Sequence, residues 1–387
     1  MDLIDKPILK EQEDNKNNDN KIDEEKDGDE DKIIFDEEPI KEINTEGDLA
    51  EIKGSWDRLE INKLKFQIIF EKISKIKFDK LEVLSINEAE IKSLDFLTND
   101  NFKSLIILEL KGNKLCSLDQ INKVPFSDLK ILDLSSNQIS SISEMEKAPF
   151  KNLEILILSN NHINDNGIKI IADGSFTKIS KLDLSGNKKI ESISTLADND
   201  TLHNLEFLYL NDNSISDISI LNKGVFKNLK ELQLSNNKIQ DLKVFESAPF
   251  HELTELLLYG NEIKFIASLT KVNFEKLKIL SLGKNKIENI EVLKEAKFSN
   301  LEKLDLFDNQ ILEIDILKNV PFKNSIQELD ISFNNLQSVK ILNDETFPSL
   351  KKEGLKFEGN KDLNYGEEII EKIYKKYGIK YTYESII

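Results

Sequence analysis

The residues with the most reactive side chains in this sequence are three histidines and one cysteine. His162, His203 and His251 lie far apart in the chain, and none has a second ligand at the short spacing that zinc sites use. No histidine is placed to activate the thiol of Cys116. The glycine-rich phosphate-binding patterns are absent as well. The sequence therefore predicts no catalytic residue, no metal site and no cofactor, and we expect a protein that is not an enzyme.

One acidic segment has the spacing of a calcium-binding loop. Asp23, Glu25, Asp27 and Gly28 stand at suitable offsets, but the twelfth position, which should be a bidentate Glu, is Ile34. The flanking residues also lack the pattern of amphipathic helices. We therefore interpret this segment as part of a solvated acidic tail.

A recurring asparagine is the dominant pattern of the chain. It returns every 24 to 26 residues, with apolar residues eight, five and three positions before it and another two or three positions after it. Leu129, Leu132, Leu134, Asn137 and Ile139 form one such unit, L-x-x-L-x-L-x-x-N-x-I. The column consists of Asn113, Asn137, Asn161, Asn187, Asn213, Asn237, Asn261, Asn285, Asn309, Asn334 and Asn360. A fixed period of this kind predicts stacked units that share one core.

These units resemble the leucine-rich repeat family over residues 81–363, in an array of about twelve units. The resemblance implies an α/β solenoid, a curved horseshoe with a parallel β-sheet on its concave face and 3₁₀ or short helical segments on its convex face. It also implies that the asparagines form a structural ladder between neighbouring turns. The alternation in residues 131–135 independently points Leu132 and Leu134 into the core.

Two further patterns refine the array. A phenylalanine precedes almost every expected strand, and we interpret this column as a packed spine. Its members are Phe78, Phe102, Phe126, Phe150, Phe176, Phe226, Phe250, Phe274, Phe298, Phe322 and Phe347, with Leu202 in one unit. Residues 161–172 contain a two-residue insertion that resembles the ribonuclease-inhibitor subclass, so a short α-helix is expected near residues 167–173.

The segments outside the array predict a tail and two caps. Residues 1–50 are rich in charge and poor in aromatic residues, which predicts an acidic disordered tail. Residues 51–80 form a degenerate opening unit, an N-terminal cap whose Trp56 we place in the core. Residues 364–387 predict a C-terminal cap, a helix that ends at Gly378 and whose tyrosines face water, followed by an edge strand over residues 379–383.

Charge and composition restrict the partners and the compartment. The net charge is −18, and residues 1–50 contribute −12 of it, from seven Lys and nineteen Asp or Glu. Lys and Arg are not clustered, so nucleic-acid binding is not expected. No apolar run approaches the ~20 residues that span a bilayer, and Met1 to Asp14 lack the apolar region of a signal peptide. We expect a cytoplasmic protein, or alternatively a nuclear one.

The positions six, four, two and one residues before each asparagine should face outward on the concave side. In the second half of the array these positions carry bulky and acidic side chains, and with strands ~4.8 Å apart Tyr259 and Phe307 should lie about 10 Å from each other. The candidate partner-binding residues are Phe207, Tyr209, Leu257, Tyr259, Phe307, Phe333, Asp305 and Asp330. Exposed aromatic residues within a polar rim are typical of a protein-binding hot spot. Two observations favour a structural interpretation instead: scattered exposed apolar residues are common, and the L-D-L-S consensus places Asp here without any partner.

The leading hypothesis is a non-catalytic interaction module or scaffold that binds a protein or peptide, with Lys or Arg in the partner, on the concave side of the units from Asn213 to Asn334. The array is similar to intracellular regulatory members of the family, including a phosphatase-regulatory subunit with the pattern N-x-I-x-x-I, although the units here are longer. One alternative is an acidic chaperone of basic proteins such as histones. Another is the substrate-recognition subunit of a phosphatase or ubiquitin-ligase complex.

Overall fold

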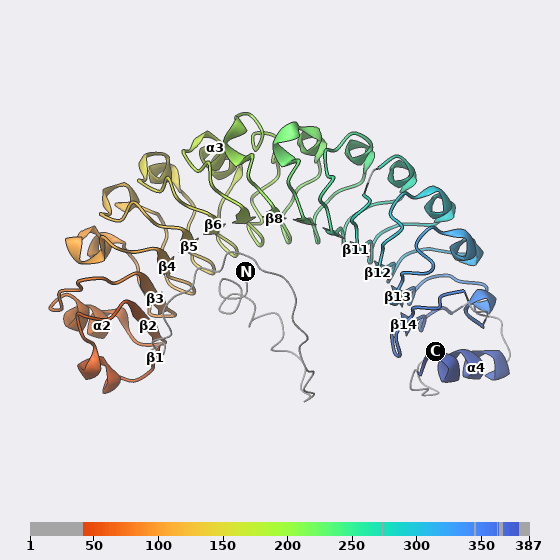
Figure 1. The fold of residues 1–387 in the computed structure, drawn as a ribbon, viewed down its shortest axis with the longest axis horizontal. Coiled ribbons are helices and arrows are strands. Elements are labelled where there is room, and N and C mark those ends of the chain that lie inside the picture. Colours follow the sequence, from red (N-terminus) through yellow and green to blue (C-terminus); the bar gives the residue numbers. More distant parts are fainter. Residues whose placement is uncertain (1–41, 273, 344–345, 362, 364–366, 379–387) are drawn as a thin grey trace. The chain divides into compact units, whose positions relative to one another are not determined.

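The computed structural model describes residues 42–272, 274–343, 346–361, 363 and 367–378. Within these residues, fourteen parallel strands form one sheet, and each strand pairs with its neighbours in chain order. In Figure 1 the strands line the inner side of a curved array, and the helical segments that connect them lie on the outer side. This arrangement confirms the predicted horseshoe solenoid.

The strands are short, and most contain three residues. They are β1 (Glu42–Ile43), β2 (Arg58–Asn62), β3 (Val83–Asn87), β4 (Ile107–Glu109), β5 (Ile131–Asp133), β6 (Ile155–Ile157), β7 (Lys181–Asp183), β8 (Phe207–Tyr209), β9 (Glu231–Gln233), β10 (Glu255–Leu257), β11 (Ile279–Ser281), β12 (Lys303–Asp305), β13 (Glu328–Asp330) and β14 (Leu355–Lys356). The α-helices of the described residues are α2 (Phe66–Ile73), α3 (Asp165–Asp173) and α4 (Glu367–Tyr377).

Single 3₁₀ turns make up most of the convex side. They are η1 (Asp48–Glu51), η2 (Asp95–Thr98), η3 (Asp100–Phe102), η4 (Ile121–Lys123), η5 (Ser143–Lys147), η6 (Asp200–Leu202), η7 (Ser219–Asn222), η8 (Gly224–Phe226), η9 (Lys243–Glu246), η10 (Ala267–Thr270), η11 (Glu291–Glu295), η12 (Asp315–Asn319) and η13 (Lys340–Asn343). A 3₁₀ turn is compact, so it returns the chain to the sheet within one 24-residue unit.

The register of the sheet aligns identical positions of successive units. Leu108, Leu132 and Leu156 pair in a row across β4, β5 and β6, and all three are fully buried. The strand residues on either side of each such leucine point to the opposite, concave face. The core is therefore continuous from turn to turn, and the concave face can be assigned by counting from each asparagine.

The eleven asparagines are buried, and their side chains bond to the backbone of two turns at once. Asn137 Oδ1 accepts the N–H of Leu115 at 3.0 Å. Its Nδ2 donates to the carbonyl of Leu110 in the preceding unit at 2.9 Å, and to the carbonyls of Leu134 and Ser135 in its own unit. One amide side chain thus satisfies backbone groups that the chain leaves open as it turns away from the strand.

Asn213 departs from this pattern. Its Nδ2 donates to the carbonyls of Leu184 and Leu210, but its Oδ1 is buried without a hydrogen-bond partner. The preceding unit explains the difference, because its apolar residue after Asn187 is displaced by one position, to Ile190. The N–H of Ile190 bonds to the carbonyl of Asn187 at 2.8 Å, so the backbone there turns differently and offers no donor to Asn213.

The predicted phenylalanine column is confirmed as a buried spine. Its eleven members are at most 4% exposed, and Leu202 is fully buried in the remaining unit. Rings of adjacent units contact one another, as in Phe126 and Phe150, whose centroids lie 5.9 Å apart in nearly parallel planes. The expected helix at the two-residue insertion is also present as α3, whose first turn is capped by the side chain of Asn164.

The N-terminal boundary of the array lies earlier than the sequence predicted. Residues 42–50 were assigned to the acidic tail, yet β1 pairs with β2, and Ile43 and Leu49 are buried in the shared core. These two apolar residues stand among so many charged ones that composition alone hides them. The predicted disorder of residues 1–41 lies outside the described residues. Trp56 is half-buried and packs against the core.

The C-terminal cap contains the predicted helix, α4, and Gly378 follows it with a φ of +67°. The expectation that the tyrosines of this cap face water is wrong for Tyr374 and Tyr377, which are 5% and 6% exposed. Tyr374 packs on Phe357 with ring centroids 5.1 Å apart, because the last turn of the array needs an apolar cover. The predicted edge strand of residues 379–383 lies outside the described residues.

The ladder predicts unequal costs for removing its members. Asn261 makes four hydrogen bonds to backbone groups, against two for Asn213. Each buried group that loses its partner costs ~1–3 kcal/mol, so we expect Asn261→Ala to destabilise the protein by about 3–5 kcal/mol and Asn213→Ala by less. The exposed Asn335 is the control, and Asn335→Ala should change stability by no more than about 0.5 kcal/mol. Urea unfolding followed by circular dichroism measures all three, and equal losses for Asn261→Ala and Asn213→Ala would contradict the hydrogen-bond assignment.

Candidate functional site

The candidate residues of the second half share the concave face of the sheet. Leu257 on β10 aligns with Ser281 on β11, Asp305 on β12 and Asp330 on β13 in one row across the strands. The intervening leucines of these strands are fully buried. Side chains at alternate positions therefore form a continuous outward surface.

Three aromatic rings on this surface contact one another. Tyr259 and Phe307 stack with centroids 6.3 Å apart and planes 18° from parallel, and Phe307 meets Phe333 at 5.3 Å. We call these three residues the aromatic cluster. Phe333 is 50% exposed, so one face of the cluster is open to solvent. The expected separation of about 10 Å, taken from the strand spacing, does not describe the rings, because the two side chains lean toward each other across the unit between them.

Two glycines make this approach possible. Gly283 occupies the position of Tyr259 and Phe307 in the intervening unit, and a methyl group there would come within 2.8 Å of both the Tyr259 ring and Asp305 Oδ2. A methyl group on Gly359 would come within 2.8 Å of the Phe333 ring, and the φ of +71° at Gly359 favours glycine in addition. The Tyr259 and Phe333 rings thus pack directly against the backbone of these two glycines. We did not predict the role of either glycine from the sequence, although counting back from Asn285 and Asn360 places both on the concave face.

The phenol of Tyr259 is available to a partner. Burial, followed by the carboxylates of Asp305 and Asp308, raises the pKa of Tyr259 above its ordinary value. The hydroxyl is therefore protonated at physiological pH and can donate a hydrogen bond. The aromatic cluster thus offers both an apolar surface and one polar group.

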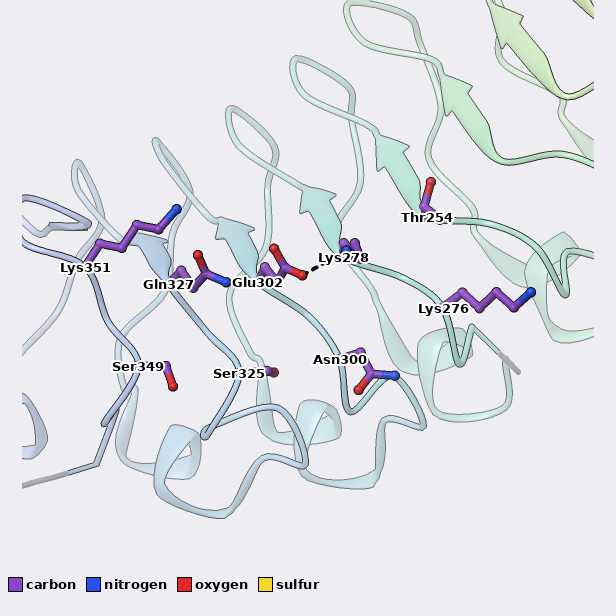
Figure 2. A pocket seen from close by; sticks show the side chains of 9 residues that line it. All are labelled: Thr254, Lys276, Lys278, Asn300, Glu302, Ser325, Gln327, Ser349 and Lys351. Atoms are coloured by element: carbon purple, nitrogen blue, oxygen red, sulfur yellow. Dashed lines mark ion pairs between the residues drawn. The ribbon is translucent and has the colours of Figure 1, made fainter. Parts of the chain in front are cut away.

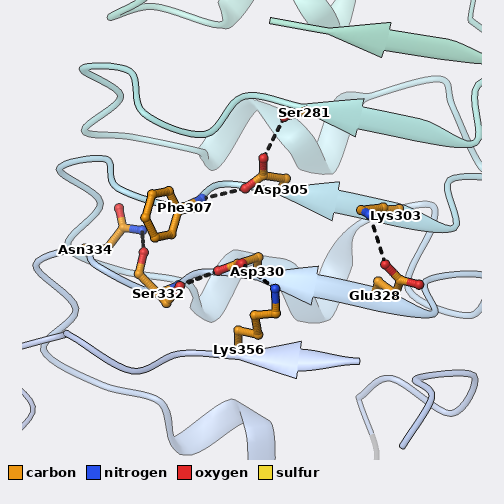
Figure 3. Close-up of polar contacts among 9 residues, drawn as sticks. All are labelled: Ser281, Lys303, Asp305, Phe307, Glu328, Asp330, Ser332, Asn334 and Lys356. Carbon is orange, nitrogen blue, oxygen red and sulfur yellow. Dashed lines mark hydrogen bonds and ion pairs between the residues drawn. The ribbon is translucent and has the colours of Figure 1, made fainter. Parts of the chain in front are cut away.

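Asp305 and Asp330 have structural partners. Asp305 Oδ1 accepts the N–H of Phe307 at 2.9 Å, and its Oδ2 accepts the hydroxyl of Ser281 at 2.6 Å. Asp330 accepts the N–H of Ser332 and forms an ion pair with Lys356 at 3.4 Å. Figure 3 shows both carboxylates held in this way within the sheet. This geometry favours the structural interpretation of the Asp in the L-D-L-S pattern.

A depression of about 470 Å³ lies beside the aromatic cluster, between β12, β14 and the loop before β14. Tyr259 and Phe307 form its apolar part. Its charged lining is balanced, since Lys303, Lys351, Lys352 and Lys356 stand against Asp305, Glu328, Asp330 and Glu353. Lys303 and Glu328 already form an ion pair at 3.2 Å, so the depression offers contact area without a strong net field.

Phe207 and Tyr209 lie apart from the aromatic cluster. Both lie on β8, two strands before the first residue of the aromatic cluster. The Tyr209 hydroxyl donates to Glu231 at 2.6 Å, and the ammonium of Lys181 lies 5.1 Å from the centre of its ring. The eight residues predicted as one site therefore do not form a single cluster. Only the three residues of the aromatic cluster have side-chain rings that contact one another.

A larger depression, of about 770 Å³, lies on the flank where the chain enters the strands. Figure 2 shows its polar lining, with an ion pair of 3.2 Å between Lys278 and Glu302. The hydroxyls of Thr254, Ser325 and Ser349 donate to backbone carbonyls of the preceding turn. These groups hold neighbouring turns together, so this flank is part of the scaffold.

The first half of the concave face carries buried carboxylates instead of aromatic residues. Glu109 on β4 lies directly opposite Asp133 on β5. Burial, followed by the charge of Asp133, raises the pKa of Glu109 to about 7. Burial also raises the pKa of Asp133, whose carboxylate accepts the N–H of Ser135 at 2.8 Å.

The reactive residues singled out in the sequence do not come together. Across the described ranges, no group of three or more His, Cys, Asp or Glu side chains is arranged to hold a metal ion. Cys116 is exposed, with its sulfur near the carbonyl of Lys114. No helix within the described part of the chain has the length and apolar character required to cross a membrane.

A curved stack of single-strand turns, each with one buried asparagine, defines the class of leucine-rich repeat solenoids. Sequence models of leucine-rich repeats match residues 127–142, 151–198 and 203–247. The chain is a leucine-rich repeat protein. A search of curated protein sequences found no match.

Solved structures with the same fold come from bacteria and plants. An internalin (InlF) of Listeria monocytogenes is 24% identical, with a TM-score of 0.58 over 79% of this chain and 88% of that one. A leucine-rich repeat protein of Leptospira interrogans is 22% identical, with a TM-score of 0.60 over 85% and 90%. The ectodomain of the Arabidopsis thaliana receptor kinase GASSHO1/SCHENGEN3, in complex with CASPARIAN STRIP INTEGRITY FACTOR 2, is 20% identical, with a TM-score of 0.54 over 78% of this chain and 35% of that one. The likeness concerns the fold.

The close packing of Gly283 predicts the effect of adding one methyl group. Overpacking at this level costs ~1–3 kcal/mol, so Gly283→Ala should lower the free energy of unfolding by that amount and alter the near-ultraviolet circular dichroism of the stacked rings. The matched control is Gly224→Ala, where nothing lies within 4 Å of the added methyl group. Equal stability of the two variants would show that the rings do not depend on Gly283.

The raised pKa of Glu109 predicts a loss of stability with rising pH. An unfolded Glu titrates near 4.5, so the folded state binds an extra proton between pH 4.5 and pH 7, and stability should fall over this range. The difference between the two pKa values corresponds to at most about 3 kcal/mol. Urea unfolding at pH 5 and pH 8 should show a smaller decrease for Glu109→Gln than for the wild type. Parallel pH profiles would contradict the assignment.

Proposed function

We propose that this chain is a non-catalytic interaction module that binds a protein or peptide partner on the concave face of β9 to β14. Leucine-rich repeat proteins are generally interaction modules, and a curved sheet presents a long row of side chains to one partner. The aromatic cluster supplies the local binding energy. The chain would act as a scaffold or as the recognition subunit of a complex whose chemistry resides in another protein.

The observation that carries this proposal is that the aromatic cluster is assembled before any partner arrives. Tyr259, Phe307 and Phe333 contact one another, and two glycines fix how closely they lie against the backbone. Rigid, partly exposed aromatic residues lose little conformational freedom on binding and dominate the energy of many interfaces. The ion pairs and hydrogen bonds around them form the polar rim that such a hot spot requires.

Other observations bear on the alternatives. The plant ectodomain of the same fold is in a complex with a protein factor, which supports a role in recognition. The histone-chaperone hypothesis rests on the acidic tail predicted for residues 1–50, of which residues 1–41 lie outside the described residues. The likeness to the phosphatase-regulatory and ribonuclease-inhibitor subclasses, and a cytoplasmic or nuclear location, stay predictions from the sequence.

The proposal predicts the behaviour of a double variant. Tyr259→Ala with Phe307→Ala should remain folded, because both side chains lie on the outward face, but partner binding should weaken at least about thirtyfold, since hot-spot truncations cost ~2 kcal/mol or more. Affinity purification of the full chain from its native cell, followed by mass spectrometry, measures the loss. Phe265→Ala is the control, since Phe265 is 73% exposed in the same unit and follows Asn261 off the concave face. An unchanged set of co-purified proteins would contradict the site assignment.

A further inference from the structure

The charge of the concave face is unevenly distributed around the aromatic cluster. Between β9 and β14, the outward positions hold seven carboxylates and three lysines. The carboxylates are Glu231, Glu255, Asp305, Asp308, Glu328, Asp330 and Glu358, and the lysines are Lys284, Lys303 and Lys356. Two of the lysines already form ion pairs with Glu328 and Asp330. The excess of negative charge thus persists away from the depression.

Glu231 and Glu255 contribute part of this excess negative charge, at the β9 and β10 end of the surface. They lie directly opposite each other on β9 and β10, in the same parallel register, and both are half-buried. Glu231 accepts the hydroxyl of Tyr209, but no Lys or Arg of the described residues forms an ion pair with Glu255. Burial, followed by the charge of Glu231, raises the pKa of Glu255, and the more distant charge of Lys303 opposes this shift without cancelling it. Like charges at this spacing repel each other, and a cation placed between them would relieve the repulsion.

The carboxylate pair and the aromatic cluster each contribute one residue to the same repeat unit, Glu255 within β10 and Tyr259 two residues past its end. Glu255 begins β10, and Tyr259 follows it by four residues, so the two side chains are separated by roughly 13 Å at ~3.3 Å per residue. Leu257 lies between them on the same face and is also half-buried. A single extended segment of a partner can therefore contact both features.

We infer that the partner of this face is an extended segment with a Lys or Arg side chain for the Glu231 and Glu255 pair and an apolar side chain for the aromatic cluster, about four residues apart. This inference rests on the proposed function and specifies its ligand. The apolar side chain enters the depression beside Phe307, and the cation takes the place between the two carboxylates. Charge complementarity of this kind fixes the register of a segment more than it adds affinity.

The test is selection of phage-displayed random peptides of twelve residues on the full chain. Peptides enriched on the wild type over the Tyr259→Ala, Phe307→Ala variant should carry Lys or Arg three to five residues from an aliphatic or aromatic residue. A synthetic copy of the best peptide should bind at least tenfold more weakly to Glu255→Lys, and its affinity for the wild type should fall as salt is raised. Glu313→Lys, which makes the same charge change at an exposed residue off this face, should bind within twofold of the wild type.

The outcomes separate the two proposals. Enriched peptides that depend on Tyr259 and Phe307 but lack a basic residue, or that bind Glu255→Lys unchanged, would overturn the inference and leave the proposed function intact. No enrichment over the double aromatic variant would overturn both. Circular dichroism of each variant verifies that a loss of binding does not come from unfolding.

Discussion

Each turn of this array leaves backbone N–H and C=O groups that it cannot satisfy alone, and the buried asparagine of the following turn satisfies them. A single unit of 24 residues has too little apolar surface to offset the entropy of its own ordering. Hydrogen bonds such as those of Asn137 to the backbone around Leu110 and Leu115 therefore couple a turn to its neighbour in addition to the shared core. The spacing of the asparagines follows from this requirement, and the register of the whole sheet follows from the spacing.

A fixed register has a functional consequence. Once every asparagine occupies an equivalent place, the side chains six, four, two and one positions earlier face the concave side, while those five and three positions earlier fill the core. Evolution can vary the concave side chains unit by unit without disturbing the ladder. In this chain the variation brings together two glycines and three aromatic residues, so the aromatic cluster arises from five positions spread over four consecutive units and the final turn.

The fold could be predicted from the sequence because about a dozen units repeat the same pattern of leucines and asparagine. The helix α3 could be predicted because its unit contains a two-residue insertion. The concave location of the candidate residues follows from the same counting. The stacking of Tyr259 on Phe307 could not be predicted, since it depends on side-chain angles and on the absence of a side chain at Gly283. The structural bonds of Asp305 depend on a hydroxyl one strand away. The boundary at residue 42 was missed because two buried residues, Ile43 and Leu49, decide it among many charged ones.

The unsatisfied side-chain oxygen of Asn213 affects how firmly two neighbouring units of the array are held together. In a one-dimensional stack each junction between neighbouring units contributes its own share to stability. The junction between the units of Asn187 and Asn213 has one ladder bond fewer than its neighbours. It lies before β9, so the whole aromatic cluster belongs to the block on its C-terminal side. Local opening at this junction would therefore leave all three residues of the aromatic cluster within one block of the array.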